Sequence, residues 1–181
     1  MDRRAFVTGL PFLAASLSGV AHAAPGGPPT GGARRSAPLQ VGQPPPPLSL
    51  SRLSGTEEVT LAGLAGRVIV LDFWATWCGP CQAIMPLLDN MYSRYQAQGL
   101  SIVGLSPESE ATIRRHMSSN PVRYTIARDV GGTIRAYGVR GIPMLVAIDR
   151  TGKVREVMVG VDGSRIRTLD TLVQRMLAEA V

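Results

Sequence analysis

The segment FWATWCGPCQAIMP, residues 73–86, constrains the fold of this chain more than any other. It contains both cysteines and both tryptophans of the 181-residue sequence. The apolar, β-branched run RVIVLDFWA (67–75) precedes the cysteines and predicts a central strand that is covered on both faces. From Pro80 to about Gln98, apolar residues recur at helical spacing. The two cysteines therefore lie where a buried strand gives way to a helix.

Strand and helix patterns alternate along the rest of the chain, which predicts an α/β fold. Residues 48–64 predict a small hairpin with Gly55 in its turn, followed by a short helical turn. The last two predicted strands form a hairpin, so the sheet should be mixed. Further strands are expected at 100–106, 123–129, 143–149 and 154–160, and helices at 107–120, 130–138 and about 164–179, the last with Ser164 as its cap.

The first 23 residues have the layout of a secretory signal, with a charged start, an apolar middle and a small-x-small end. The middle is too weakly apolar for a stop-transfer helix, so cleavage is favoured and a retained membrane tether is the alternative. Arg3-Arg4 favours the twin-arginine route over an ordinary Sec signal. We predict a signal peptide at 1–23, a Pro/Gly-rich linker at 24–40, and a periplasmic or otherwise extracytoplasmic domain at 41–181.

Composition argues against two classes of function. The net charge is +6, but the basic residues are scattered arginines without a basic stripe, which disfavours nucleic-acid binding. A zinc site needs about four ligands, and His116 is the only His that remains after the predicted signal peptide. We therefore expect no metal site and no nucleic-acid partner.

The Cys-x-x-Cys spacing favours a redox pair. A structural disulfide over so short a loop would add little stability. Cys78 lies at the predicted helix start, where unpaired N–H groups and the helix dipole stabilise a nucleophilic thiolate. Cys81, one turn on, is placed to resolve a mixed disulfide. Gly79 leaves the surface open to a substrate, and Pro80 stiffens the first helical turn.

Two other residues near the cysteines are candidates for function. Asp72 is an acid within the apolar central strand, so burial should raise its pKa and let it exchange a proton with Cys81. Trp77 is expected to lie against the redox pair and shape its contact surface, whereas Trp74 is expected in the core.

The segment LDFWATWCGPCQAIMP resembles the active-site segment of thioredoxin-fold oxidoreductases. From about Val41 to Val181 the chain is similar to the exported TlpA/ResA-type branch. The resemblance implies a thioredoxin-like fold, a central mixed sheet flanked by helices. It also implies an N-terminal β-hairpin extension and an insertion between the active-site helix and the second landmark, VRGIPMLVAID. At that landmark it implies that Pro143 is cis and faces the cysteines, and that Ile142 pairs with an extended substrate segment.

One position departs from the branch. Many TlpA/ResA-type proteins carry a glutamate three residues after the second cysteine, whereas this sequence has Ile84 there. The acid role therefore falls to Asp72, as in thioredoxins. Cytochrome c biogenesis remains a setting in which the branch acts, but this motif does not transfer its substrate, apocytochrome c.

The resemblance implies an exported thiol:disulfide oxidoreductase that reduces protein disulfides. It would need no metal or organic cofactor beyond its own redox-active disulfide, and a membrane electron donor of the thiol-disulfide relay type would reset it. Because the Gly-Pro dipeptide only biases the potential, a periplasmic disulfide oxidase or isomerase is an alternative. A Cu(I)-binding, metallochaperone-like module that uses both thiolates is another.

Overall fold

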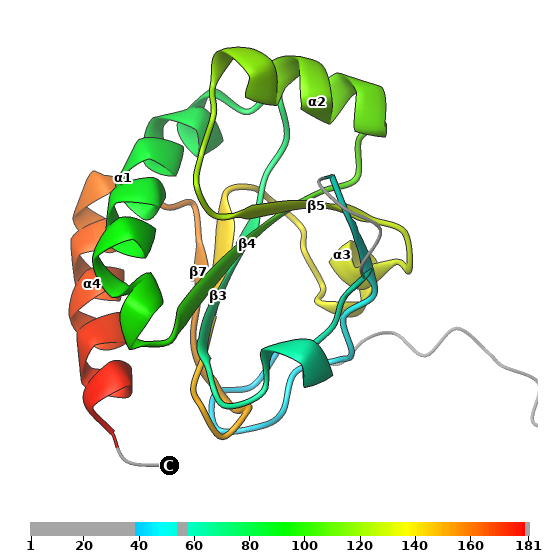
Figure 1. Cartoon of the computed structure of the whole chain (residues 1–181). Coiled ribbons are helices and arrows are strands. Elements are labelled where there is room, and N and C mark those ends of the chain that lie inside the picture. Colours follow the sequence, from blue (N-terminus) through cyan, green and yellow to red (C-terminus); the bar gives the residue numbers. More distant parts are fainter. Residues whose placement is uncertain (1–38, 54–57, 180–181) are drawn as a thin grey trace, which may run out of the picture. The chain divides into compact units, whose positions relative to one another are not determined.

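A seven-stranded mixed sheet forms the centre of the protein. The computed structural model describes residues 39–53 and 58–179 (Figure 1). The strand order is β2-β1-β5-β4-β3-β6-β7. Strands β3, β4 and β5 run parallel to one another, while the other neighbouring pairs are antiparallel. This arrangement confirms the predicted α/β class and the mixed sheet.

The elements follow the alternation that the sequence predicts. The strands are β1 (Leu50–Arg52), β2 (Glu58–Val59), β3 (Val68–Phe73), β4 (Leu100–Ser106), β5 (Thr125–Asp129), β6 (Met144–Ile148) and β7 (Val154–Val159). The helices are α1 (Gly79–Tyr95), α2 (Glu110–Ser119), α3 (Thr133–Ala136) and α4 (Gly163–Ala178), with 3-10 turns η1 (Ala62–Leu64) and η2 (Gln96–Gln98).

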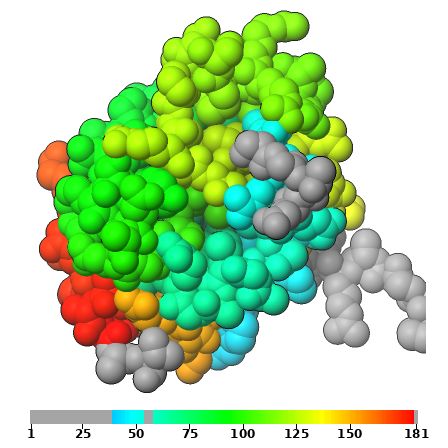
Figure 2. Space-filling model, in the orientation of Figure 1, coloured from blue at the N-terminus to red at the C-terminus, as the bar shows by residue number. Residues whose placement is uncertain are grey.

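Both faces of β3 are covered, and all six of its residues are buried. Because side chains alternate along a strand, Val68 and Val70 enter one core, together with buried residues of α1 and α4. We call this the α1-side core. Ile69 and Leu71 enter the opposite core, which lies beneath α3, η1 and the segment that precedes β1. Helices α1 and α4 lie side by side over the sheet face that borders the α1-side core (Figure 1). Helices α1 and α2 form much of the surface seen in Figure 2.

Helix α1 begins where its sequence predicts but ends at Tyr95, earlier than the predicted Gln98. Cys78 is its N-cap, and η2 continues the helical region to Gly99, which adopts a left-handed φ of 103°. A glycine favours that conformation because it has no Cβ. The buried side chains of α1 face the sheet. The helix thus has one end fixed by the cysteine and one face fixed by the core.

Two predicted helix starts are corrected by the capping contacts. Helix α2 begins at Glu110 rather than at 107. The Ser109 hydroxyl accepts a hydrogen bond from the amide of Thr112 and thereby caps the helix at that point. The cap of α4 is Asp162 and not Ser164. Its carboxylate accepts the amides of both Ser164 and Arg165, whereas the Ser164 hydroxyl only donates to the same carboxylate.

The structure describes only part of the predicted N-terminal organisation. Strands β1 and β2 pair antiparallel, but Gly55 in their predicted turn lies outside the described residues. The predicted signal peptide at 1–23 and nearly all of the linker at 24–40 also lie outside them, so these boundaries stay predictions. Within residues 39–53 and 58–179, no helix has the length and apolarity needed to cross a bilayer.

Adjacent leucines of α1 provide a test of this packing. Leu88 is fully buried in the α1-side core, whereas Leu87 is 42% exposed. We expect Leu88→Ala to lower the free energy of unfolding by about 2–5 kcal/mol, because it leaves a cavity. Leu87→Ala should cost less than about 1 kcal/mol. Urea denaturation of the oxidised protein measures both, and equal losses would contradict the assigned helix face.

Candidate active site

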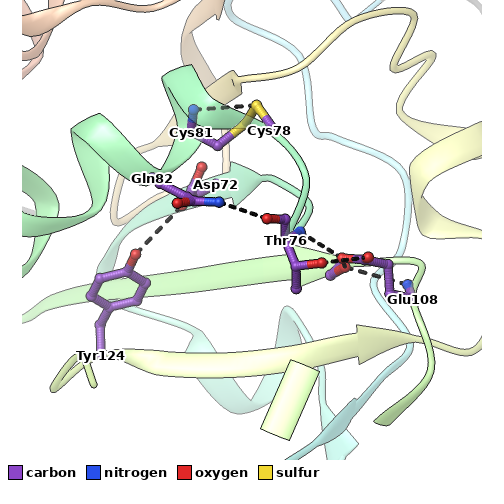
Figure 3. Close-up of a disulfide and its surroundings, with 8 residues drawn as sticks. Asp72, Thr76, Cys78, Cys81, Gln82, Glu108 and Tyr124 are labelled. Atoms are coloured by element: carbon purple, nitrogen blue, oxygen red, sulfur yellow. Dashed lines mark hydrogen bonds between the residues drawn. A yellow bond between two sulfur atoms is a disulfide. The ribbon is translucent and has the colours of Figure 1, made fainter. Parts of the chain in front are cut away.

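The two cysteines form a disulfide at the start of α1 (Figure 3). Cys78 ends the loop that leaves β3 and caps the helix, while Cys81 lies in its first turn. The amide of Cys81 donates a hydrogen bond to the Cys78 sulfur at 3.2 Å. Cys81 is fully buried and Cys78 is 4% exposed. A reduced Cys78 sulfur would therefore keep a backbone donor and the positive end of the helix dipole beside it, and both stabilise a thiolate.

The outer side of the disulfide is flanked by exposed residues. Trp77 is 73% exposed, so its indole lies on the surface beside Cys78. Gly79 and Pro80 are also exposed, and a Cβ added at Gly79 would have no neighbour within 4 Å. A protein segment can therefore approach from this side without meeting a side chain at position 79. Trp74, by contrast, is 1% exposed and lies in the core as expected.

Asp72 is buried on the same face of the sheet as Cys81. It lies two residues from Val70 and from Trp74 along the chain, so it shares their strand face, which enters the α1-side core, and it is 0% exposed. Burial raises the pKa of Asp72 to about 7, and a hydrogen bond from Tyr124 opposes part of that rise. The predicted burial is confirmed, and the raised pKa follows from that burial. An acid with this pKa can gain or lose a proton near neutral pH.

The Ile142–Pro143 peptide bond is cis, as the resemblance implies. It directly precedes β6, and Met144 at the start of β6 pairs with Phe73 at the end of β3. Because the two strands are antiparallel, Pro143 lies at the same sheet edge from which the chain departs toward Cys78. Pro143 is buried, and Ile142 is half-buried against both cores.

Comparison with known proteins identifies the family. Residues 41–157 match the AhpC/TSA family. The chain belongs to the AhpC/TSA family. It is 32% identical over 124 residues to thiol-disulfide oxidoreductase ResA of Bacillus thuringiensis (strain Al Hakam), covering 67% of this chain and 71% of that protein. The ResA protein of Geobacillus thermodenitrificans is 33% identical over the same shares.

Solved structures agree with this assignment. A Chlorobium tepidum protein assigned as thiol:disulfide interchange protein DsbE superposes with a TM-score of 0.73 at 33% identity, covering 77% of this chain and 99% of that one. A second Chlorobium tepidum protein, a thiol:disulfide interchange protein of the thioredoxin family, gives 0.67 at 26% identity over 78% and 100%. The protein is thus a thiol-disulfide oxidoreductase of the TlpA/ResA type with a thioredoxin-like fold.

In this oxidoreductase, the loop before Cys78 is held by residues that the sequence did not single out. The Glu108 carboxylate accepts the Thr76 amide at 2.6 Å and the Thr76 hydroxyl at 2.7 Å (Figure 3). The Gln82 side chain donates to the Thr76 carbonyl at 2.6 Å. All three polar groups of Thr76 are thereby fixed, two residues before the N-cap. Glu108 is 32 positions from Thr76, so no local pattern could have indicated the contact.

His116 of α2 is half-buried and contacts a core residue next to the site. Its ring lies 5.5 Å from that of Trp74, and its Nε2 is buried without a hydrogen-bond partner in the described structure. It therefore supports the core next to the site.

Among residues 39–53 and 58–179, no three His, Cys, Asp or Glu side chains gather in a way that could hold a metal ion.

Glu108→Gln tests the loop contact. The side-chain amide of the new glutamine keeps one acceptor oxygen, but its NH2 group replaces the other oxygen. One of the two Thr76 donors, the backbone amide or the hydroxyl, therefore loses its acceptor. We expect the free energy of unfolding to fall by about 1–3 kcal/mol and the Thr76 amide to exchange hydrogen faster. Glu110→Gln is the matched control, because the ion pair of Glu110 with Arg114 is exposed and helical, worth about 0.5 kcal/mol or less. Equal effects would show that Glu108 does not hold the loop.

Asp72→Asn tests the raised pKa through stability. In the oxidised protein the folded pKa is about 7 against 3.8 for the ordinary group, so the folded state binds the proton more tightly. The contribution of Asp72 to stability is then present below about pH 4 and is lost as the pH rises to about 7. Over that window, stability should shift in favour of Asp72→Asn by about 4 kcal/mol. Urea denaturation from pH 4 to 8 checks this, and parallel curves for the two proteins would contradict it.

Proposed function

We propose that this protein is an exported reductase of protein disulfides that works through Cys78 and Cys81. The observation that carries the proposal is the hydrogen bond from the Cys81 amide to the Cys78 sulfur at the start of α1. It gives the outer sulfur a stabilised thiolate, and the exposed Trp77 beside it offers a flat apolar surface to a polypeptide.

The proposed reaction has two steps. The Cys78 thiolate attacks one sulfur of a substrate disulfide, a mixed disulfide forms, and the other substrate sulfur leaves as a thiolate. Cys81 then transfers its proton to the Asp72 carboxylate and attacks the Cys78 sulfur. The Cys78–Cys81 bond forms, the bond to the substrate breaks, and the second substrate thiolate leaves. The substrate has gained two electrons and the cysteine pair has lost them.

The residues around the pair have proposed roles in binding. Ile142 and Pro143 present the backbone before β6 to an extended substrate segment, in the manner of strand addition. Trp77, Gly79 and Pro80 form the other side of the contact. Relatives named as thiol-disulfide oxidoreductases and thiol:disulfide interchange proteins support a protein substrate.

The proposal places the protein outside the cytoplasm. The signal-like sequence at 1–23 supports export by the twin-arginine or Sec route, and an uncleaved signal would leave a membrane tether. Each turnover leaves the cysteines oxidised, so a dithiol donor must return two electrons. A membrane donor of the thiol-disulfide relay type fits that need, and the cycle uses no metal or organic cofactor.

The reduction potential of the Cys78–Cys81 pair tests the direction. We expect a value near that of thioredoxin, about −270 mV, because the Gly-Pro dipeptide matches it. Equilibration of the full-length chain with defined thiol and disulfide buffers measures the potential. A value near about −120 mV would overturn the reductase and favour a disulfide oxidase.

Trapping identifies the attacking cysteine and separates the enzyme from a copper carrier. Cys81→Ser should accumulate a mixed disulfide between Cys78 and a model disulfide peptide, because nothing resolves it, whereas Cys78→Ser should accumulate none. A Cu(I) titration of the reduced protein runs beside it. Stoichiometric tight Cu(I) binding without any mixed disulfide in Cys81→Ser would refute the enzyme and favour the metallochaperone-like alternative.

A further inference from the structure

The buried carboxyl of Asp72 has one hydrogen-bond donor among the described side chains, the phenol of Tyr124. The Tyr124 hydroxyl lies 3.5 Å from Asp72 Oδ2, and both residues are buried, with exposures of 3% and 0% (Figure 3). The other oxygen, Oδ1, has no partner in that part of the chain. Burying an ionised carboxylate away from water is costly. A single hydrogen-bond donor therefore has a large effect on the stability of the ionised form.

The missing side chain of Gly104 makes room for this contact. Gly104 is paired in register with Asp72 on the neighbouring strand β4. A Cβ at that position would meet the ring of Tyr124 at 3.3 Å and the Cδ1 atom of Ile126 at 2.8 Å. The Tyr124 ring therefore lies beside the glycine, and its hydroxyl reaches Asp72.

Helix α1 holds Tyr124 in position. The Asp89 carboxylate accepts the backbone amide of Arg123 at 2.6 Å and its guanidinium at 2.7 Å and 3.0 Å. The ring of Tyr92 meets that of Tyr124 edge-on, with 6.5 Å between centroids. The residue before Tyr124 and the ring itself are thus both fixed to the helix that carries Cys81.

Few charged or titratable groups surround the pair. Helix α1 contributes Cys81, Asp89 and Tyr92, and α2 contributes His116, whose ring packs against Trp74. The buried side chains of α4 are all apolar. Burial, with the negative charges of Asp72 and Asp89, raises the pKa of Tyr124 well above its ordinary value, so the phenol keeps its proton and remains a donor.

We propose that Tyr124 is a positioning residue for the proton exchange between Cys81 and Asp72. Its hydroxyl donates a hydrogen bond to the ionised Asp72 carboxylate while Cys81 gives up its proton. The inference rests on the proposed role of Asp72. In the resolving step the proton passes from the Cys81 sulfur to Asp72, and the Tyr124 hydrogen stays on its own oxygen. The hydroxyl favours the ionised carboxylate and thereby sets the pH above which Asp72 can accept that proton.

A carboxyl titration of the full-length, oxidised chain tests the inference. With ¹³C-labelled aspartate, the Asp72 signal is the one that Asp72→Asn removes. We expect its midpoint near pH 7 in the wild type and higher by about one unit in Tyr124→Phe, because the ionised form loses its donor. In the reduced protein, the pH midpoint of mixed-disulfide resolution should move upward with it.

Tyr137→Phe is the matched control. The Tyr137 hydroxyl is also buried and donates to the Pro46 carbonyl at 2.8 Å, but it lies with the opposite core. Its loss should leave the Asp72 midpoint unchanged. Replacement of Tyr124 by 3-fluorotyrosine keeps the ring and strengthens the donor, so the midpoint should fall. This variant gives an answer even where Tyr124→Phe does not fold.

The outcomes separate the two proposals. If Tyr124→Phe and the fluorinated protein titrate like the wild type while Asp72→Asn removes the signal, Tyr124 has no such role and Asp72 keeps its own. If no aspartate titrates near pH 7 and Asp72→Asn resolves mixed disulfides with the wild-type pH profile, Asp72 also has no role in the resolving step. Either result overturns the inference about Tyr124.

Discussion

The hydrogen bond from the Cys81 amide to the Cys78 sulfur connects the chemistry of this protein to its fold. It exists because Cys78 is the N-cap of α1, where the first backbone N–H groups have no partner within the helix. The cap in turn depends on β3, which is buried on both faces and fixes the point where the chain leaves the sheet. The Glu108 and Gln82 contacts with Thr76 then determine the path of the loop between them.

The second constraint is the alternation of side chains along β3. It directs Asp72 toward the same core as Cys81, where water is excluded and an ordinary carboxyl becomes an acid with a pKa of about 7. The two groups of the proposed proton exchange are thus placed by different elements, a strand and the helix above it. Tyr124 comes from a third position, before β5, and reaches Asp72 across the gap that Gly104 leaves.

Much of the fold could be predicted because its signals are local. The continuous apolar run at 67–75 predicted β3, and the helical spacing after Pro80 predicted α1, with Gly99 ending the helical region after η2. The cap of α4 was misplaced, since Asp162 and Ser164 are both good caps by residue type and only the backbone geometry decides between them. The contacts of Glu108, His116 and Tyr124 could not be predicted, because each joins residues far apart in the sequence.

The sequence by itself determined the redox pair, its place between a strand and a helix, and the acid in the strand. These features depend on neighbouring residues and on periodicity, which any reader of the chain can follow. Only the tertiary structure decided which side chains surround them: that a tyrosine donates to Asp72, that a glutamate holds the loop before Cys78, and that Pro143 lies at the edge from which this loop departs. The physical reason is that the packing of β3 against β4 and β6 creates these neighbours, and strand pairing acts over distances that no local pattern encodes.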